Sequence, residues 1–246
     1  MAQVAHFKTK EFNTENLVFA VKKRNIIPVF YKKDDSLIPF GLHTCEVSLP
    51  FGCSESQFGF SDFKDYYITA ALNNYDSDKS VIRFKKTIEN IENSLVNHVL
   101  NNYSTYFSTP CENLTETVSS MLTPTLKQNN VNYPPSISFS IPRNTKNGVF
   151  DCDIYDSDSN TEKLSDDNIL EILPKHVKIK CAINCIGAWT REGKKGGKPS
   201  GFGLKWELCQ AKVMEKKKDL KMLSDDENTD NVKGYAMLDD EWCLKY

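Results

Sequence analysis

The side chains best suited to chemistry in this 246-residue sequence are cations and aromatic residues between positions 176 and 213. The cations alternate with apolar residues along two strand-like stretches and also fill the glycine-rich stretch between them. A single-stranded nucleic acid is held by cations along its backbone and by flat side chains on which its bases stack. We therefore predict ten nucleic-acid contacts: Lys178, Lys180, Trp189, Arg191, Lys194, Lys195, Lys198, Phe202, Lys205 and Lys212.

The aromatic residues in this stretch have a competing interpretation as core residues. Trp206 shares its parity with Leu204 and Leu208, which predicts burial. Trp189 also shares the apolar parity of its strand, but Gly187 could let the strand twist just before it, so both a buried and an exposed Trp189 stay open. The same two possibilities hold for Phe202.

Two strands must position these residues. In HVKIKCAINCIGAW, from position 176, the apolar side chains fall on one parity and the lysines on the other. This alternation predicts a long, half-buried strand with a basic outer face. FGLKWELCQAKV, from position 202, alternates in the same way and predicts its partner strand. Four glycines and four cations make residues 190–201 a predicted mobile hairpin loop.

The spacing of apolar residues in the rest of the chain predicts a mainly β protein with a few helices, which belongs to the α+β class. One helix is expected at 88–100, one from a capping box that begins at Thr109, and one from Ser165 to Leu173. Strands are expected as a pair within 16–31, near 43–49, 66–71 and 80–84, and at 136–141 with 149–155 as its partner strand.

The charge is unevenly distributed along the chain, although the total is only −2. Residues 171–223 carry 13 basic and five acidic side chains, a net charge of +8. The flanking stretches 151–170 and 224–246 carry net charges of −6 and −5. Such asymmetry indicates a polyanion site between acidic segments, although an uneven solvated surface would give the same counts.

The C-terminal acidic stretch, 224–246, is poor in branched aliphatic residues and ends in aromatic ones. We expect it to be disordered until it docks on a partner. Its predicted partner-binding residues are Asp239, Asp240, Glu241, Trp242 and Tyr246. The preceding residues, 1–223, are predicted to form a single domain.

The sequence lacks the common signatures of catalysis and metal binding. Of the four histidines, which stand apart in the sequence, His98 and His176 have no acidic or cysteine neighbour at ligand spacing. The eight cysteines form no CxxC pair, which predicts reduced, mostly buried thiols. The acidic stretch DCDIYDSDSN lacks the glycine and glutamate of a calcium loop. No phosphate loop, HExxH or GxSxG motif occurs. We therefore expect no catalytic residue, metal or cofactor, and no enzyme activity.

Two stretches resemble a known family. They are YPPSISFSIPRNTKNGVFDCDIYDSD from position 133 and VKIKCAINCIGAWTREGKKGGKPSGFGLKWELCQAKV from position 177. The chain resembles the single-stranded-DNA-binding replication proteins of large nucleocytoplasmic DNA viruses in four features. These are a proline-rich entry to an alternating strand, Gly-x-Trp at 187–189, Phe-Gly-x-x-Trp at 202–206 and Gln-x-Lys-Val at 210–213. The resemblance covers about residues 130–213.

This resemblance implies an oligonucleotide-binding (OB)-type barrel with inserted helices. It also implies a protein that coats single-stranded DNA during viral replication, recombination or repair and recruits replication proteins through its acidic tail. We expect an intracellular protein, in the host cytoplasm or nucleus, because no apolar run approaches the roughly 20 residues of a membrane span and no signal-peptide core is present. Self-association stays open. The alternatives are a viral structural or scaffold protein with a basic surface strip, and, more distantly, a nuclease that uses the aspartates.

Overall fold

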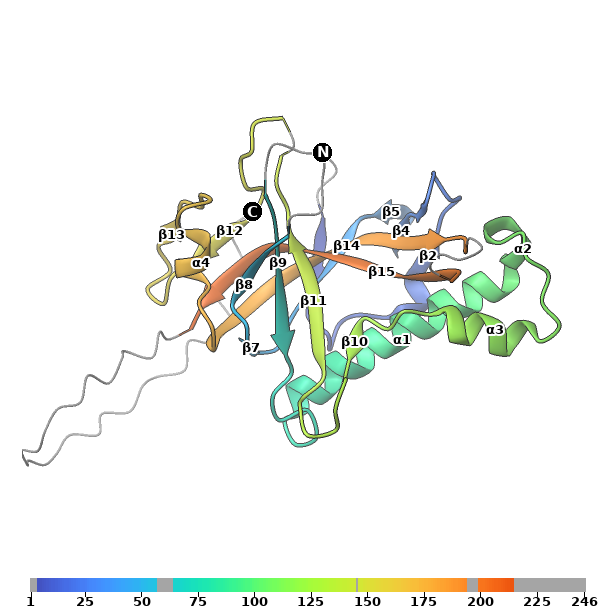
Figure 1. Cartoon of the computed structure of the whole chain (residues 1–246), viewed down its shortest axis with the longest axis horizontal. Coiled ribbons are helices and arrows are strands. Elements are labelled where there is room, and N and C mark those ends of the chain that lie inside the picture. Colours follow the sequence, from blue (N-terminus) through green and yellow to red (C-terminus); the bar gives the residue numbers. More distant parts are fainter. Residues whose placement is uncertain (1–3, 57–63, 145, 194–198, 215–246) are drawn as a thin grey trace, which may run out of the picture. The chain divides into compact units, whose positions relative to one another are not determined.

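Two long antiparallel strands organise the fold, because each alternates apolar and polar side chains along most of its length. They are β14 (Val177–Arg191) and β15 (Gly201–Val213), of 15 and 13 residues, drawn in orange in Figure 1. The computed structural model describes residues 4–56, 64–144, 146–193 and 199–214. The described residues belong to one compact unit of the chain. The predicted tail, 224–246, lies outside them.

Most of the described strands are short and lie in one large sheet, and the remainder form a small one. The small sheet has the order β2 (Leu17–Phe19), β4 (Val29–Lys33), β5 (Ser36–Ile38). Besides β14 and β15, the large sheet contains β1 (Ala5–Phe7), β3 (Ile26–Ile27), β6 (Phe40–His43), β7 (Val47–Leu49), β8 (Cys53–Ser56), β9 (Asp65–Ala71), β10 (Leu126–Lys127), β11 (Ser136–Ile141), β12 (Asp153–Tyr155) and β13 (Thr161–Glu162).

Hydrogen bonding closes part of the large sheet into a ring. Among the described strands the ring runs β14–β7–β9–β11–β15 and returns to β14. Four of its pairings are antiparallel. The fifth joins β11 to β15 in parallel through Ser140 and Glu207 alone. The OB fold is likewise built on five strands. The predicted mainly β class with a few helices is confirmed.

The long helix α1 (Lys79–Asn101) buries its apolar stripe in the hydrophobic core. The Asp78 side chain starts it by accepting hydrogen bonds from the backbone N–H groups of Ser80, at 2.7 Å, and Val81, at 3.3 Å. The buried residues recur at three- and four-residue steps: Val81, Phe84, Ile88, Ile91, Leu95 and Val99. Each fully buried side chain of this size contributes about 1.5–3 kcal/mol, so this stripe fixes the helix on the core.

Shorter helices follow α1. They are α2 (Tyr103–Tyr106), α3 (Leu114–Met121) and α4 (Ile169–Ile172), and a 3-10 turn, η1 (Thr14–Asn16), precedes it. Among the described helices, none combines the length and the apolar character that crossing a membrane requires.

Four local predictions are wrong, each for an identifiable reason. The expected strand at 80–84 is helical because Asp78 begins α1 there. The helix expected from Thr109 begins at Leu114, because the capping pair is Asn113 with Glu116. The helix from Ser165 is reduced to the four residues of α4.

The fourth error is a long-range pairing. The stretch 149–155 was expected to pair with 136–141 as a hairpin. Only its last three residues form a strand, β12, which pairs in parallel with β15. An isolated bridge between Arg143 and Phe150 is all that remains of the hairpin among the described residues.

Candidate nucleic-acid interface

A β-bulge reverses the outer half of β14. Before Ile186 the odd-numbered residues of the strand are mostly the buried ones, and after Gly187 the even-numbered ones are. Between Cys185 and Gly187 the pairing with β15 skips Ile186. One inserted residue exchanges the faces taken by all following side chains. Trp189 and Arg191 therefore lie on the outer face, away from the core, of the two-stranded ribbon that β14 and β15 form. The structure thus places Trp189, half-buried, on the outer face and not in the core.

Gly187 is the residue that permits this bulge. Its φ angle of 135° lies in a region that side chains other than glycine rarely adopt. A Cβ atom here would also lie 2.8 Å from the backbone oxygen of Ile27, on the neighbouring strand β3. The glycine therefore serves both the backbone angle and the close approach of β3.

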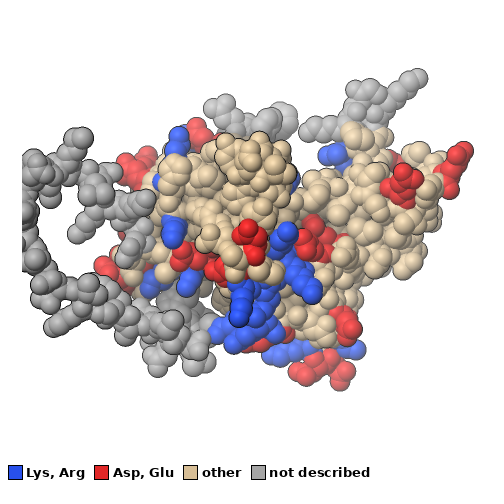
Figure 2. Space-filling model, turned by 90° about the horizontal axis from the view of Figure 1, so that it is seen from below, with Lys and Arg blue, Asp and Glu red and all other residues tan. Residues whose placement is uncertain are grey.

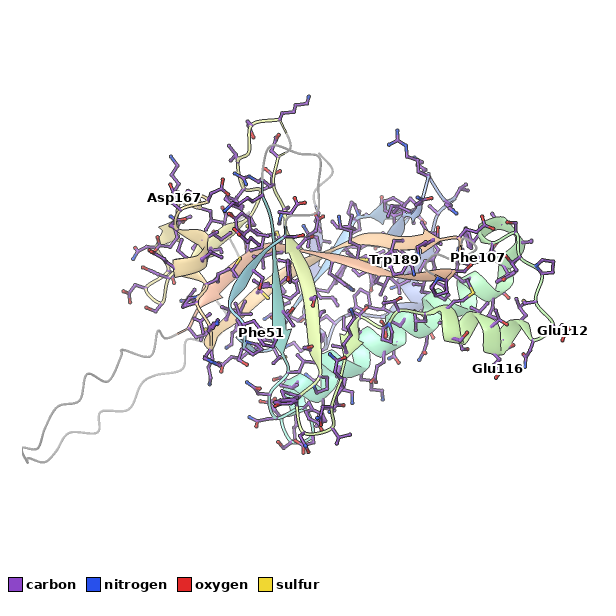
Figure 3. All side chains as sticks on the ribbon, in the orientation of Figure 1. Phe51, Phe107, Glu112, Glu116, Asp167 and Trp189 are labelled. Atoms are coloured by element: carbon purple, nitrogen blue, oxygen red, sulfur yellow. The ribbon has the colours of Figure 1, made fainter. Side chains whose placement is uncertain are left out.

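The indole of Trp189 lies over two glycines of β15, Gly203 and Gly201. It is half-buried and stands directly across from Gly203. A Cβ atom on Gly203 would be 3.1 Å from the indole Nε1 and 3.2 Å from Cε2, and one on Gly201 would be 3.7 Å from the ring edge. The guanidinium of Arg191 lies over the ring, 5.3 Å from its centroid. Trp189 lies near the loop end of the ribbon (Figure 3). Together with Arg191 it presents flat surfaces of the kind on which bases stack.

Three predicted lysines form a basic strip at the other end of the same ribbon. Lys180 stands directly across from Lys212, and both point away from the core. Lys212 Nζ donates to Ser159 Oγ at 2.7 Å, and Lys178 Nζ lies 3.0 Å from a Glu46 carboxylate oxygen. Lys180 has no ion-pair or hydrogen-bond partner among the described residues. We name Lys178, Lys180 and Lys212 the basic strip.

Two other predicted contacts are placed less favourably. Lys205 is exposed, but its Nζ lies 2.9 Å from a carboxylate oxygen of Glu207, which offsets its charge. Phe202 is completely buried, with its ring centroid 6.4 Å from that of Phe107. It faces the core because the even-numbered residues of β15 do so up to Leu208. The structure therefore removes Phe202 from the stacking surface. Trp206 is buried, as expected.

The loop between β14 and β15 is anchored at its base. Arg191 Nε donates to the Pro199 carbonyl oxygen at 3.1 Å, and the Gly193 N–H donates to Ser200 Oγ at 2.9 Å. The carboxylate of Glu192 accepts hydrogen bonds from the hydroxyl and backbone N–H of Ser108, which hold its pKa below the usual range. The predicted loop contacts Lys194, Lys195 and Lys198 lie outside the described residues.

One exposed aromatic residue on this outer face was not predicted from the sequence. Tyr67 on β9 is 41% exposed and stands across from Ser140, which in turn pairs with Glu207 of β15. Its neighbours Tyr66 and Ile68 are buried. The alternation along β9 is therefore the signal that would have placed Tyr67 on the outer face.

Asp166 is held by a structural partner, and Cys181 and Cys185 are buried. Asp166 accepts two hydrogen bonds from the Arg143 guanidinium, at 2.7 and 2.8 Å, which hold the pKa of this carboxyl below its usual range. Burial raises the pKa of the Cys181 and Cys185 thiols to about 12, which opposes thiolate formation. Among the described residues no three His, Cys, Asp or Glu side chains are grouped to bind a metal ion.

Comparison with known proteins finds similarity only among solved structures. No family model matches the chain, and no curated protein sequence matches it. It is similar to the single-stranded DNA-binding protein from bacteriophage Enc34 in complex with single-stranded DNA, with 16% identity and a TM-score of 0.41 over 84% of this chain and 99% of that one. It is also similar to gp2.5, a single-stranded DNA-binding protein encoded by bacteriophage T7, with 12% identity and a TM-score of 0.38 over 75% and 97% of the two chains.

Proposed function

We propose that this protein binds single-stranded DNA with little sequence preference. The observation that carries the proposal is the bulge in β14, which turns Trp189 and Arg191 out of the core. They come to lie on the same ribbon face as the basic strip. A flat aromatic surface and a row of cations on one face are the two elements that binding of a single strand requires.

The mechanism combines stacking and charge. A base stacks on the Trp189–Arg191 pair, and the DNA backbone follows the ribbon to the basic strip. Every base has a flat face and every nucleotide a phosphate, so such contacts tolerate any sequence. Lys180, which has no partner among the described residues, is the strip cation most available to a phosphate. In this proposal Lys194, Lys195 and Lys198, which lie outside the described residues, add phosphate contacts.

The proposed role is to coat single strands during viral DNA replication, recombination and repair, inside the infected cell. This part rests on the sequence motifs at 187–189, 202–206 and 210–213. The proposal assigns the protein no catalytic step.

The acidic segment 224–246 has a regulatory part in the proposal. Its net charge of −5 and its aromatic residues Trp242 and Tyr246 imitate a short stretch of nucleic acid. A tethered segment competes at an effective concentration that reaches millimolar, so even weak docking on the basic face masks the site. We propose that DNA displaces this segment, which then recruits replication proteins.

Fluorescence anisotropy with labelled single- and double-stranded oligonucleotides of one mixed sequence tests the function. We expect preference for the single strand and a steep loss of affinity with salt. Each phosphate contact contributes about −0.7 to the log–log slope of affinity against salt, so the basic strip and the three loop lysines, six contacts, give roughly −4.2. Replacing Lys194, Lys195 and Lys198 by alanine should make the slope shallower by about 2.

Controls test each part of this proposal separately. The circular dichroism spectrum of the variant with Lys194, Lys195 and Lys198 replaced by alanine should match that of the unchanged protein, which shows that its fold is intact. Equal affinity for single and double strands, or none for either, would contradict the proposed function and favour a structural protein. Deleting 224–246 should tighten binding at low salt; unchanged affinity at about 50 mM salt would exclude masking by the tail.

A further inference from the structure

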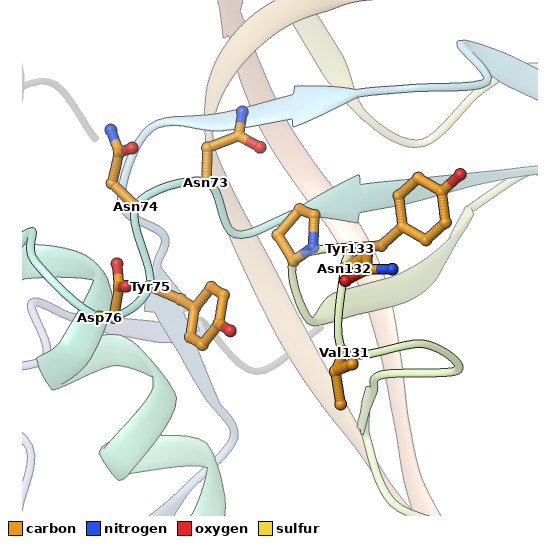
Figure 4. A pocket seen from close by; sticks show the side chains of 8 residues that line it. Asn73, Asn74, Tyr75, Asp76, Val131, Asn132 and Tyr133 are labelled. Carbon is orange, nitrogen blue, oxygen red and sulfur yellow. The ribbon is translucent and has the colours of Figure 1, made fainter.

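A shallow depression of about 390 Å³ lies beside the end of β9, between residues 73–76 and 131–134. Figure 4 shows the side chains that line it, which include Tyr75, Tyr133, Asn73 and Asn132. Tyr133 is 68% exposed and Val131 is 84% exposed. The depression therefore combines aromatic rings with amide groups at the surface, the two kinds of group that contact a nucleobase.

A short row of contacts connects this depression to the basic strip. Lys178 stands directly across from Ser48 on the neighbouring strand β7. The Ser48 hydroxyl accepts a hydrogen bond of 2.8 Å from Nδ2 of Asn73, which lines the depression. The depression thus begins one strand away from Lys178, at the end of the ribbon opposite to Trp189.

One cation of α1, Lys85, borders the other side of the depression, with its Nζ 5.6 Å from the ring centroid of Tyr75. Lys79, Arg83 and Lys86 lie in the same first turns of α1, but on the helix face turned away from Lys85. They are exposed, and the four- and three-residue steps between them place them on one face of the helix. None of these three forms an ion pair with a described residue. α1 begins at the lower edge of the view in Figure 1, and Figure 2, seen from below, shows Lys and Arg side chains gathered near the centre of that side.

The position of Lys79 is unfavourable for the helix itself. The N-terminal end of a helix carries a partial positive charge that acts within the first turn, so a cation there is repelled and acidic residues are favoured. The first turn of α1 contains no acidic residue, and the Asp78 carboxylate is occupied in capping. A bound polyanion would remove this repulsion.

We propose that the depression and the exposed cations of α1 form a second subsite for the same DNA strand. A base lies against a tyrosine ring of the depression, and Lys79, Arg83 and Lys86 contact the phosphates that follow. The strand reaches this subsite from the basic strip at Lys178. This inference rests on the proposed function. It extends the path of the strand from the ribbon onto α1.

The acidic segment 224–246 is the competing occupant of this surface. The observations favour DNA because the depression is continuous with the basic strip through Ser48 and Asn73.

The test measures the affinity of the full-length protein for oligothymidylates from about 4 to 16 nucleotides and longer, the span of known site sizes. The test variant carries Lys79→Gln, Arg83→Gln and Lys86→Gln. Its affinity for the shortest strands should equal that of the unchanged protein, while the gain on longer strands is lost. With three contacts removed, the salt slope on long strands should be shallower by about 2.

Two further variants complete the design. Tyr133→Ser removes an exposed ring and should weaken only long-strand binding, by roughly 5- to 150-fold, as for the loss of one stacked base. The matched control replaces Lys10, Lys32 and Lys33, three exposed lysines distant in sequence from the subsite, by glutamine. The control should keep the length dependence of the unchanged protein.

The outcomes distinguish this inference from the proposed function. If the unchanged protein binds no strand of any length, the proposed function fails. If it binds and Trp189→Ala weakens binding, but the α1 variant behaves like the control at every length, only the second subsite is refuted. A variant that keeps all DNA binding but no longer binds a synthetic peptide of residues 224–246 would assign the surface to the acidic segment and overturn the proposal.

Discussion

Replacing Trp189 by alanine should separate DNA binding from stability, because its indole lies outside the core. The ring rests on Gly203 and Gly201 of the partner strand, and its main polar contact is the guanidinium of Arg191. An exposed cation–π contact contributes about 0.5–1 kcal/mol. We therefore expect Trp189→Ala to lower the free energy of unfolding by about 1 kcal/mol. Binding should lose one stacked base, about 1–3 kcal/mol, which corresponds to roughly 5- to 150-fold in affinity.

Trp206 provides the internal comparison, since it is the same residue type one strand away. Its side chain is 2% exposed and meets the Phe40 ring edge-on, with centroids 6.2 Å apart. Truncation of a buried tryptophan to alanine costs about 3–5 kcal/mol. Trp206→Ala should thus lose much more stability than Trp189→Ala. Where it does not fold, Trp206→Phe supplies a smaller truncation at the same position.

Urea unfolding followed by circular dichroism measures the stability of each variant. Anisotropy with a labelled mixed-sequence single strand measures binding at one fixed salt concentration. Trp189→Phe should retain most of the affinity, since a flat ring remains. A loss of about 3 kcal/mol or more in Trp189→Ala, or an unchanged affinity, would refute the assignment of Trp189 to the binding face.

Three further predictions concern charge. Lys180→Ala removes one of two like charges directly across from each other, so stability should rise by about 0.2–0.5 kcal/mol. The DNA salt slope should become shallower by about 0.7 in the same variant, and a fall in stability would contradict this reasoning. Asp166→Ala loses two hydrogen bonds from Arg143 and should destabilise the protein by about 2 kcal/mol in urea, with unchanged DNA affinity. Burial lowers the pKa of His98 below 6.5, so the unfolded chain takes up a proton first as pH falls. Urea midpoints should therefore fall as pH drops below 6.5, and less steeply in His98→Phe.

The sequence by itself determined the elements whose signal is local. Strict alternation predicted the strands that became β11, β14 and β15, and three- and four-residue spacing predicted the helix that became α1. The outward position of Lys178 and Lys180 and the burial of Trp206 followed from the same parity. These features were predictable because a regular strand or helix fixes the direction of each side chain relative to its near neighbours.

The tertiary structure alone decided which residues beyond an irregularity face outward. Parity counted without the bulge at Ile186 leaves Trp189 open between core and surface, and the bulge resolves it. Phe202 is buried because β15 keeps its parity from the start of the strand. The parallel pairing of β12 with β15 replaced the hairpin expected locally. The depression forms only where residues 73–76 meet residues 131–134, two segments far apart in sequence. Such long-range pairings depend on how all elements pack together, which no local pattern records.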